Sequence, residues 1–326
     1  MPDYGYLLPT RGIVLSSADE ETLAAKARSD IVGLAERAET MGFGSVWVGD
    51  SVLAKPRLEP LSTLSAVATA TDAIGLGTAV YLPPLRDPVH VAHLTATLDQ
   101  LSGGRFRFGI GVGIGPDVEA EYANLGVPFE ERGPRLSELL EVVTALWSGE
   151  AVDFNGRFCE LEDASIGFGP VGKPPIYIPT AAFDPTEGFP GPIRDRLVEH
   201  GDGWLPINVS PAGYETSLSA IRGLLEEAGR DPAALDPAIY LDVVIDEDED
   251  AAIEQARDFY DRYYPAWGRL SDEEVLAKGV FGPPAEVAAR LEEYAEAGVE
   301  TMAVRFTTPQ QREQLRRFDE AVAVDS

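Results

Sequence analysis

Cysteine, histidine and lysine are all scarce in this sequence of 326 residues. Cys159 is the only cysteine, so no disulfide can form within the chain, and we expect a reducing compartment, the cytoplasm. Three histidines and one cysteine cannot build the usual zinc clusters, so we predict no metal site. The sequence also lacks a signal peptide and any apolar run long enough to cross a bilayer. We therefore expect no membrane partner.

Positive charge is scarce as well. The chain carries 26 Lys and Arg against 55 Asp and Glu, a net charge of −29, and only four of its basic residues are lysine. Such a chain repels nucleic acid, so we expect no nucleic-acid partner. Self-repulsion is tolerable where salt screens it, because the Debye length is only ~3 Å at ~1 M salt. We interpret the chain as a halophilic cytosolic enzyme, with an ordinary acidic protein as the alternative.

What is present is an alternation of strand-like and helix-like segments, without a long linker or an internal repeat. A hydrophobic content of 44% is enough for a full core. The pattern predicts one (β/α)8 barrel domain of the TIM type over residues 1–326, with insertion loops at the C-terminal face of the strands. The predicted strands are 4–9, 45–49, 75–80, 106–111, 175–179, 203–206, 239–245 and 301–305. The main predicted helices are 21–41, 61–70, 89–101, 133–147, 192–200, 214–228, 250–263, 284–297 and 309–323, and 149–173 and 264–278 are predicted to be irregular.

Several chemistries are excluded by missing motifs. The sequence has no Gly-x-Ser-x-Gly and no phosphate-binding loop with Lys-Ser/Thr. A glycine run from Gly109 to Gly115 lacks the spacing of a dinucleotide fingerprint. Glycines at strand ends allow either close backbone packing or room for a flat ring or phosphate, and the two interpretations are compatible.

Seven segments carry a resemblance that extends in order over nearly the whole chain. They are GFGSVWVGD at 42–50, GLGTAV at 75–80, LDQLSGGRF at 98–106, FEERG at 129–133, LWSGE at 146–150, PPIYI at 174–178 and GDGWL at 201–205. Together they resemble the bacterial-luciferase-like monooxygenase family. The resemblance implies a (β/α)8 barrel that binds FMN or the deazaflavin coenzyme F420 at the C-terminal ends of the strands.

The resemblance also implies a cofactor shelf at the end of the third strand. In the family a non-prolyl cis peptide there supports the flavin ring from behind, and the matching bond is Ala79–Val80. We therefore predict that Thr78, Ala79 and Val80 bind the cofactor. The small side chain of Ala79 favours this interpretation, because a large one would fill the place of the ring.

The second strand end departs from the family pattern. Luciferases and several F420 enzymes have a histidine after the acid, whereas here Ser51 follows Asp50. We predict Asp50 and Ser51 as the catalytic candidates, although serine cannot act as a general base near neutral pH. The alternative is that Asp50 is only a structural hydrogen-bond acceptor. His93, on the following helix, is a weaker candidate for reaching the substrate.

A second departure concerns the phosphate. The arginine that holds it in luciferases matches Val112, which lies between Gly111 and Gly113, and we predict that these two glycines contact the cofactor. Backbone N–H groups at Thr180 and Ala181, after the fifth strand, are the first candidate for gripping the phosphate.

Basic residues gather on the predicted rim. Arg57 is a further candidate for binding the anionic part of the cofactor, together with Arg11 and Lys55 nearby. The alternative is that they pair with acids such as Glu59.

Three functions remain open. The first is an FMN monooxygenase supplied by a separate flavin reductase, and the second is an F420-dependent dehydrogenase or reductase that needs no oxygen. The third is a non-catalytic flavin-binding homologue. In each case we expect a small-molecule ligand, a homodimer that pairs through the helices after the second and third strands, and a lid made of 149–173 and 183–191.

Overall fold

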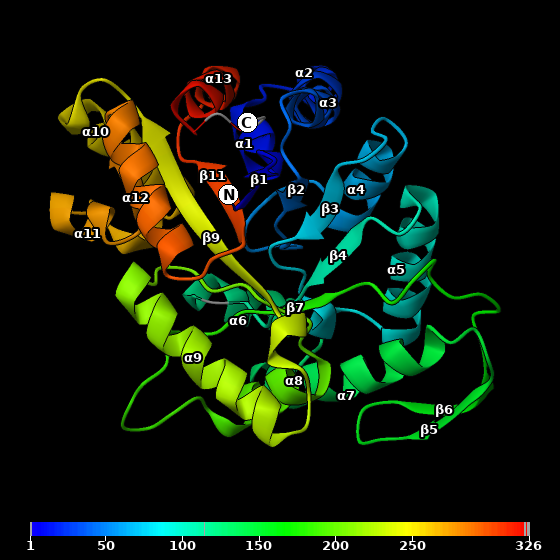
Figure 1. Cartoon of the computed structure of the whole chain (residues 1–326). Coiled ribbons are helices and arrows are strands. Elements are labelled where there is room, and N and C mark those ends of the chain that lie inside the picture. The colour runs from blue at the N-terminus through cyan, green and yellow to red at the C-terminus, as the bar shows by residue number, and fades with distance from the viewer. Residues whose placement is uncertain (1, 114, 323, 325–326) are drawn as a thin grey trace.

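Eight parallel strands close into a barrel in the computed structural model, which describes residues 2–113, 115–322 and 324 (Figure 1). Strand β9 pairs with both β8 and β11, and β11 pairs with β1, so the ring is complete. The predicted (β/α)8 fold is confirmed. In ring order the strands are β1 (Asp3–Leu7), β2 (Ser45–Val48), β3 (Gly75–Thr78), β4 (Phe106–Gly109), β7 (Ile176–Ile178), β8 (Gly203–Trp204), β9 (Asp236–Ile245) and β11 (Thr301–Phe306).

Helices surround this barrel on its outer side (Figure 1). They are α1 (Thr10–Ser16), α2 (Glu20–Ala27), α3 (Gly33–Thr40), α4 (Pro60–Ala68), α5 (Pro88–Ser102), α6 (Pro116–Asn124), α7 (Arg132–Leu146), α8 (Gly191–His200), α9 (Pro211–Glu227), α10 (Glu249–Tyr263), α11 (Asp272–Leu276), α12 (Pro284–Glu296) and α13 (Gln311–Val322). The predicted helix 21–41 is present as α2 and α3, joined by a π-helical turn at Arg28–Val32.

Local sequence explains where several helices begin and end. The carboxylate of Asp19 accepts a hydrogen bond from the N–H of Thr22 at the start of α2, and Ser210 does the same for Gly213 at the start of α9. These side chains satisfy N–H groups that have no partner within the helix. Helix α5 ends at Gly103, whose φ of 69° is a left-handed conformation that glycine adopts without a steric penalty.

Several helices and strands of the structure were not predicted from the sequence. Among them are helices α1, α6 and α11 and strand β10 (Gly279–Gly282). Helices α1 and α11 have only seven and five residues, too few to display a helical period. Strand β10 pairs with the last four residues of β9, beyond the residues of β9 that pair with β8. Helix α10 then returns to the barrel, where Tyr260 donates a hydrogen bond of 2.7 Å to Asp242. The segment that follows α10 therefore lies at the C-terminal mouth of the barrel.

The predicted irregular stretch 149–173 instead contains an antiparallel hairpin of β5 (Val152–Asn155) and β6 (Glu160–Ala164). Glu138 of α7 accepts hydrogen bonds of 2.7 Å from the N–H groups of Arg157, Phe158 and Cys159, which lie in the turn between β5 and β6. The hairpin packs on the outer side of α7, away from the barrel mouth (Figure 1). The role of this stretch as part of a lid stays a prediction.

Aromatic side chains fill much of the space between the barrel and its helices. The ring centroid of Phe306 on β11 lies 5.6 Å from that of Tyr6 on β1 and 5.8 Å from that of Phe318 on α13. All three are buried, and large rings of this kind dominate the energetics of a core. Within the described residues, no helix combines the length and the apolar character that a membrane crossing requires.

Candidate active site

The carboxyl ends of the eight strands meet at one mouth, which is where barrel enzymes place their sites. Just below it lies a small apolar cluster inside the barrel, consisting of Leu7, Trp47, Ala79, Tyr177, Leu205, Ala238 and Ala303, with Val80 and Tyr240 packed against them. Trp47 and Tyr177 meet edge to face, with centroids 5.4 Å apart. This cluster forms the floor of the mouth.

The peptide bond between Ala79 and Val80 is cis, which confirms the prediction for this bond. Ala79 is buried and Val80 is half-buried at the edge of the floor. The hydroxyl of Thr78 donates a hydrogen bond of 2.6 Å to the carbonyl oxygen of Gly109, so it is turned toward β4. The cofactor-binding roles of Thr78, Ala79 and Val80 stay predictions.

The glycine run packs against this shelf. A Cβ on Gly109 would overlap the carbonyl oxygen of Thr78, and a Cβ on Gly111 would lie 2.7 Å from Cγ2 of Val80. Both glycines are therefore required by the protein's own packing. Gly113 has a φ of 76°, which also favours glycine. A direct contact of Gly111 or Gly113 with the cofactor remains a prediction.

Asp50 is buried, and both of its carboxylate oxygens accept hydrogen bonds. Its two oxygens accept hydrogen bonds of 2.6 and 3.0 Å from the guanidinium of Arg86, and Oδ2 also accepts one of 2.9 Å from the N–H of Leu82. Burial raises the pKa of Asp50, and Arg86 offsets only part of that rise. These bonds hold the loop after β3 against the end of β2. They match the alternative in which Asp50 is a structural acceptor.

Ser51 is buried beside Glu121 of α6. Its hydroxyl donates a hydrogen bond of 2.9 Å to Oε1 of Glu121, and the same oxygen accepts bonds from the N–H groups of Val52, Leu53 and Ala54. Oε2 of Glu121 is buried and has no hydrogen-bond partner among the described residues. Glu121 thus fixes the loop that follows β2.

At the end of β7, the hydroxyl of Thr180 accepts a hydrogen bond of 2.8 Å from Nε1 of Trp204 and donates one of 2.6 Å to the carbonyl oxygen of Ala181. Ala181 and Ala182 are exposed, and within the described residues their N–H groups donate to no protein acceptor. N–H groups are therefore available at the predicted phosphate-binding loop, and binding of the cofactor phosphate there stays a prediction.

Arg57 reaches into the mouth from the loop after β2. Its guanidinium lies against Gly49, where a Cβ would overlap Nη1 and would lie 3.5 Å from the carbonyl oxygen of Ala79. Burial lowers the pKa of Arg57, while Tyr264, Tyr240 and Asp50 act in the opposite direction. The structure thus brings Arg57 and Ala79 together.

A second arginine, Arg305 at the end of β11, forms an ion pair with Asp242 at 2.5 Å. Its Nη1 also donates a hydrogen bond of 2.9 Å to the hydroxyl of Tyr264, and its guanidinium lies 5.3 Å from the ring of Tyr240. Because Tyr240 packs against the floor, these contacts connect Tyr264 to the shelf at Ala79. Burial raises the pKa of Tyr264, but the surrounding cations, Arg305 first, lower it by more, so it lies below its ordinary value.

Sequence reasoning missed Arg86, Arg305 and Tyr264. Arg86 follows the predicted third strand, so its position at the C-terminal face was a usable signal. Tyr264 gave no such signal, because it follows a helix rather than a strand and comes to the mouth only through the return of α10. His93 is exposed on α5 and contacts Phe168 with centroids 5.6 Å apart, away from the mouth. Within the described residues, no three His, Cys, Asp or Glu side chains group as metal ligands.

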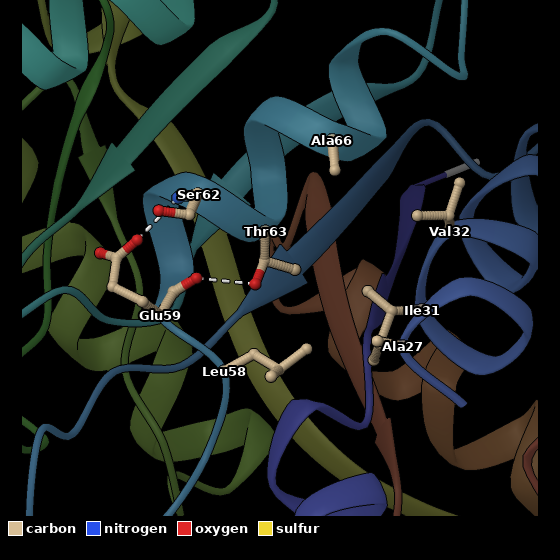
Figure 2. Close-up of a pocket in the computed structure, with 8 residues that line it drawn as sticks. All are labelled: Ala27, Ile31, Val32, Leu58, Glu59, Ser62, Thr63 and Ala66. Carbon is tan, nitrogen blue, oxygen red and sulfur yellow. Dashed lines mark hydrogen bonds between the residues drawn. The ribbon is translucent and has the colours of Figure 1, made fainter. Parts of the chain in front are cut away.

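Two hollows lie away from the shelf at Ala79, and one of them is lined in part by Ala182 of the loop after β7. One of about 280 Å³ runs between α4 and the segment from α2 to the π-helical turn, and it is lined mostly by apolar groups (Figure 2). The carboxylate of Glu59 on its edge accepts a hydrogen bond of 2.7 Å from the N–H of Ser62, so it caps α4. A hollow of about 370 Å³ lies between the start of α9 and β10. Neither contains the shelf, so we place the candidate site at the mouth.

Comparisons with known proteins agree on the type of protein. Residues 3–301 match the family profile described as luciferase-like monooxygenase. An F420-dependent glucose-6-phosphate dehydrogenase from Kineococcus radiotolerans is 32% identical over 321 residues, which cover 90% of this chain and 91% of that protein. A 5,10-methylenetetrahydromethanopterin reductase from Archaeoglobus fulgidus is 32% identical over 222 residues, which cover 68% of this chain and 61% of that protein.

Solved structures share the fold. A monooxygenase from Streptomyces bottropensis superposes with a TM-score of 0.81 at 23% identity, with 98% of each chain covered. An F420-dependent secondary alcohol dehydrogenase, solved with an F420-acetone adduct, gives a TM-score of 0.79 at 20% identity over 100% of this chain and 99% of that one.

Proposed function

The chain belongs to the luciferase-like monooxygenase family, and from this premise we propose that it is an oxidoreductase that transfers hydride between coenzyme F420 and a small organic substrate. One observation carries the choice of F420. Two relatives that are at least 30% identical and cover 90% of this chain are F420-dependent glucose-6-phosphate dehydrogenases. The relatives described above are oxidoreductases, so the proposal narrows the cofactor rather than the class.

The second candidate is an FMN-dependent monooxygenase. It is supported by the family description and by the fold of an FMN-bound Baeyer–Villiger monooxygenase from Pseudomonas putida, which has a TM-score of 0.75. In that case a separate flavin reductase would supply the reduced cofactor. The relatives are enzymes, which argues against the hypothesis of a non-catalytic flavin-binding homologue.

The residues at the mouth fit a flat, anionic cofactor. Ala79 keeps the shelf free of a bulky side chain, and the floor beneath it is apolar. Ala181 and Ala182 are exposed, and their N–H groups suit phosphate oxygens. A reduced deazaflavin supplies a hydride, and its oxidised form accepts one.

The protein supplies binding, orientation and a place for the proton. Leu7, Ala79, Val80 and Tyr240 exclude water from the face of the shelf. Ser51 and Asp50 orient the loops after β2 and β3 through Glu121 and Arg86. The titratable oxygen available for a substrate proton is Oη of Tyr264, because cations keep its pKa below the ordinary range of tyrosine.

Cofactor binding tests this proposal. The protein is titrated with F420 and with FMN, and binding is followed by cofactor fluorescence. Oxidised F420 is then offered with secondary alcohols and sugar phosphates, and loss of its visible absorbance reports reduction. We expect F420 to bind more tightly and to turn over without oxygen. Tight FMN binding, with oxygen consumption dependent on a reductase and NAD(P)H, would select the monooxygenase instead.

We further propose that the enzyme works as a homodimer in a salt-rich cytoplasm. The net charge of −29 supports the salt-rich setting. Helix α5, which follows the third strand, exposes Leu94 and Leu101 by about half, and apolar groups of this kind suit a contact between subunits.

A further inference from the structure

Three cations gather on one side of the mouth, at the carboxyl ends of β1 and β2. Arg11 lies in the first turn of α1, and Lys55 and Arg57 lie in the loop between β2 and α4. Burial lowers the pKa of all three groups, and the charge of Arg57 lowers the pKa of Arg11 and of Lys55 further. The three charges therefore act on one another.

No described carboxylate forms an ion pair with either arginine of this group, although the charge of Asp50 raises the pKa of Arg57. Within the described part of the chain, neither Arg11 nor Arg57 forms an ion pair, and Nε and Nη1 of Arg11 are buried without a hydrogen-bond partner. The acids at the mouth are engaged elsewhere, Asp50 by Arg86 and Asp242 by Arg305. Among the three cations, Asp117 raises the pKa of Lys55 alone.

Aromatic rings position the cations but carry no net charge. The guanidinium of Arg11 lies 5.3 Å from the ring of Tyr263 and 5.4 Å from that of Tyr264, and Nζ of Lys55 lies 5.5 Å from the ring of Tyr264. Such contacts offset only part of the cost of removing a cation from water. Like charges held together in a partly buried place need an anion to balance them. In a chain with 55 acids, the absence of an ion pair at Arg11 and Arg57 among the described residues marks a binding site.

We propose that Arg11, Lys55 and Arg57 form an anion subsite that binds a carboxylate or phosphate group of the substrate. The substrate is then an organic acid or a phosphate ester that also carries the oxidisable or reducible centre. Guanidinium groups suit this task because their N–H donors match the oxygens of both anions.

The assignment to substrate rather than cofactor rests on the proposed function. Strands β1 and β7 lie four places apart in the ring of eight, so they face each other across the mouth. If the cofactor phosphate binds at Ala181 and Ala182 after β7, the cations after β1 and β2 lie on the opposite side of the ring. An anionic substrate fits that side.

The test uses the full chain without cofactor and inorganic phosphate as the probe. Affinity is measured by calorimetry and by the shift in Tm, against potassium chloride at equal ionic strength. We expect wild type to bind phosphate, Arg11→Gln and Lys55→Gln to weaken binding at least tenfold, and Arg37→Gln to match wild type. Arg37 is exposed on α3, so this control removes the same charge from outside the mouth. Absence of phosphate binding by wild type, or an equal loss in Arg37→Gln, would overturn the subsite.

F420 binding to the same variants separates the two sources of the anion. Unchanged F420 affinity in Arg11→Gln supports a subsite for the substrate, whereas a parallel tenfold loss assigns the cations to the cofactor and overturns the substrate assignment. If the wild-type protein binds phosphate but not F420, the proposed function is contradicted and the anion subsite is still supported. Far-UV circular dichroism and Tm of each variant show whether it is folded.

Discussion

At the scale of single residues, the sequence predicted backbone features better than side-chain partners. The cis bond at Ala79–Val80 lies in a segment that matches the family, and the nearby glycines are required by close packing. Partners such as Arg86 for Asp50 and Arg305 for Asp242 depend on which loops meet in space. Pairs 36 and 63 residues apart leave no local pattern, so only the folded chain reveals them.

Tyr264 provides a test at this scale. Burial raises the pKa of each of the other ten tyrosines, whereas the cations around Tyr264 lower its pKa below the ordinary value of 10. We expect an alkaline titration followed by phenolate absorbance to show one tyrosine ionising below pH 10. The substitution Tyr264→Phe should remove that step, and Tyr263→Phe should keep it.

The sign of the effect on stability follows from the same shift. A phenol with a lowered pKa in the folded state adds stability above pH 10, and that contribution disappears as the pH falls through the lowered value. Phosphate bound at Arg11 would neutralise nearby charge and move this titration back toward pH 10. A wild-type titration that begins only above pH 10 would show that the cations do not control Tyr264.

At the scale of elements, regular strands and helices followed the hydrophobic pattern, and the exceptions were insertions. The hairpin of β5 and β6 looked irregular because its strands are four and five residues long and half-exposed. Its place on α7 depends on Glu138, which lies 19 to 21 residues from the turn residues that it binds. The position of α10 at the mouth similarly depends on distant contacts, of Tyr260 with Asp242 and of Tyr264 with Arg305, which no local signal predicted.

One substitution tests whether the hairpin contributes to the candidate site. Glu138→Ala removes the acceptor of three N–H groups in the hairpin turn, so we expect hydrogen exchange at 157–159 to accelerate at least tenfold. Cofactor affinity should stay within twofold of wild type, because the hairpin lies outside α7. Glu141→Ala, an exposed change on the same helix, should leave both measurements unchanged. A tenfold loss of cofactor affinity in Glu138→Ala would support a lid role for the hairpin.

At the scale of the whole molecule, the excess of acids sets the response to salt. Exposed ion pairs such as Arg316 with Glu313 weaken as salt rises, but acids outnumber bases by about two to one, so repulsion dominates the balance. The Debye length falls from ~10 Å at ~0.1 M to ~3 Å at ~1 M. Screening at the higher concentration therefore removes more repulsion than attraction.

We expect the unfolding midpoint in denaturant to rise when KCl is increased over this range, with urea as the denaturant because it carries no charge. Glu292→Gln, an exposed change on α12, removes one negative charge and should stabilise the protein by up to about 0.5 kcal/mol at low salt. That gain should vanish in molar KCl, because the salt already screens the charge it removes. Equal midpoints in low and molar KCl would mean that the surface charges are balanced locally, and the salt-rich setting would then have no physical support.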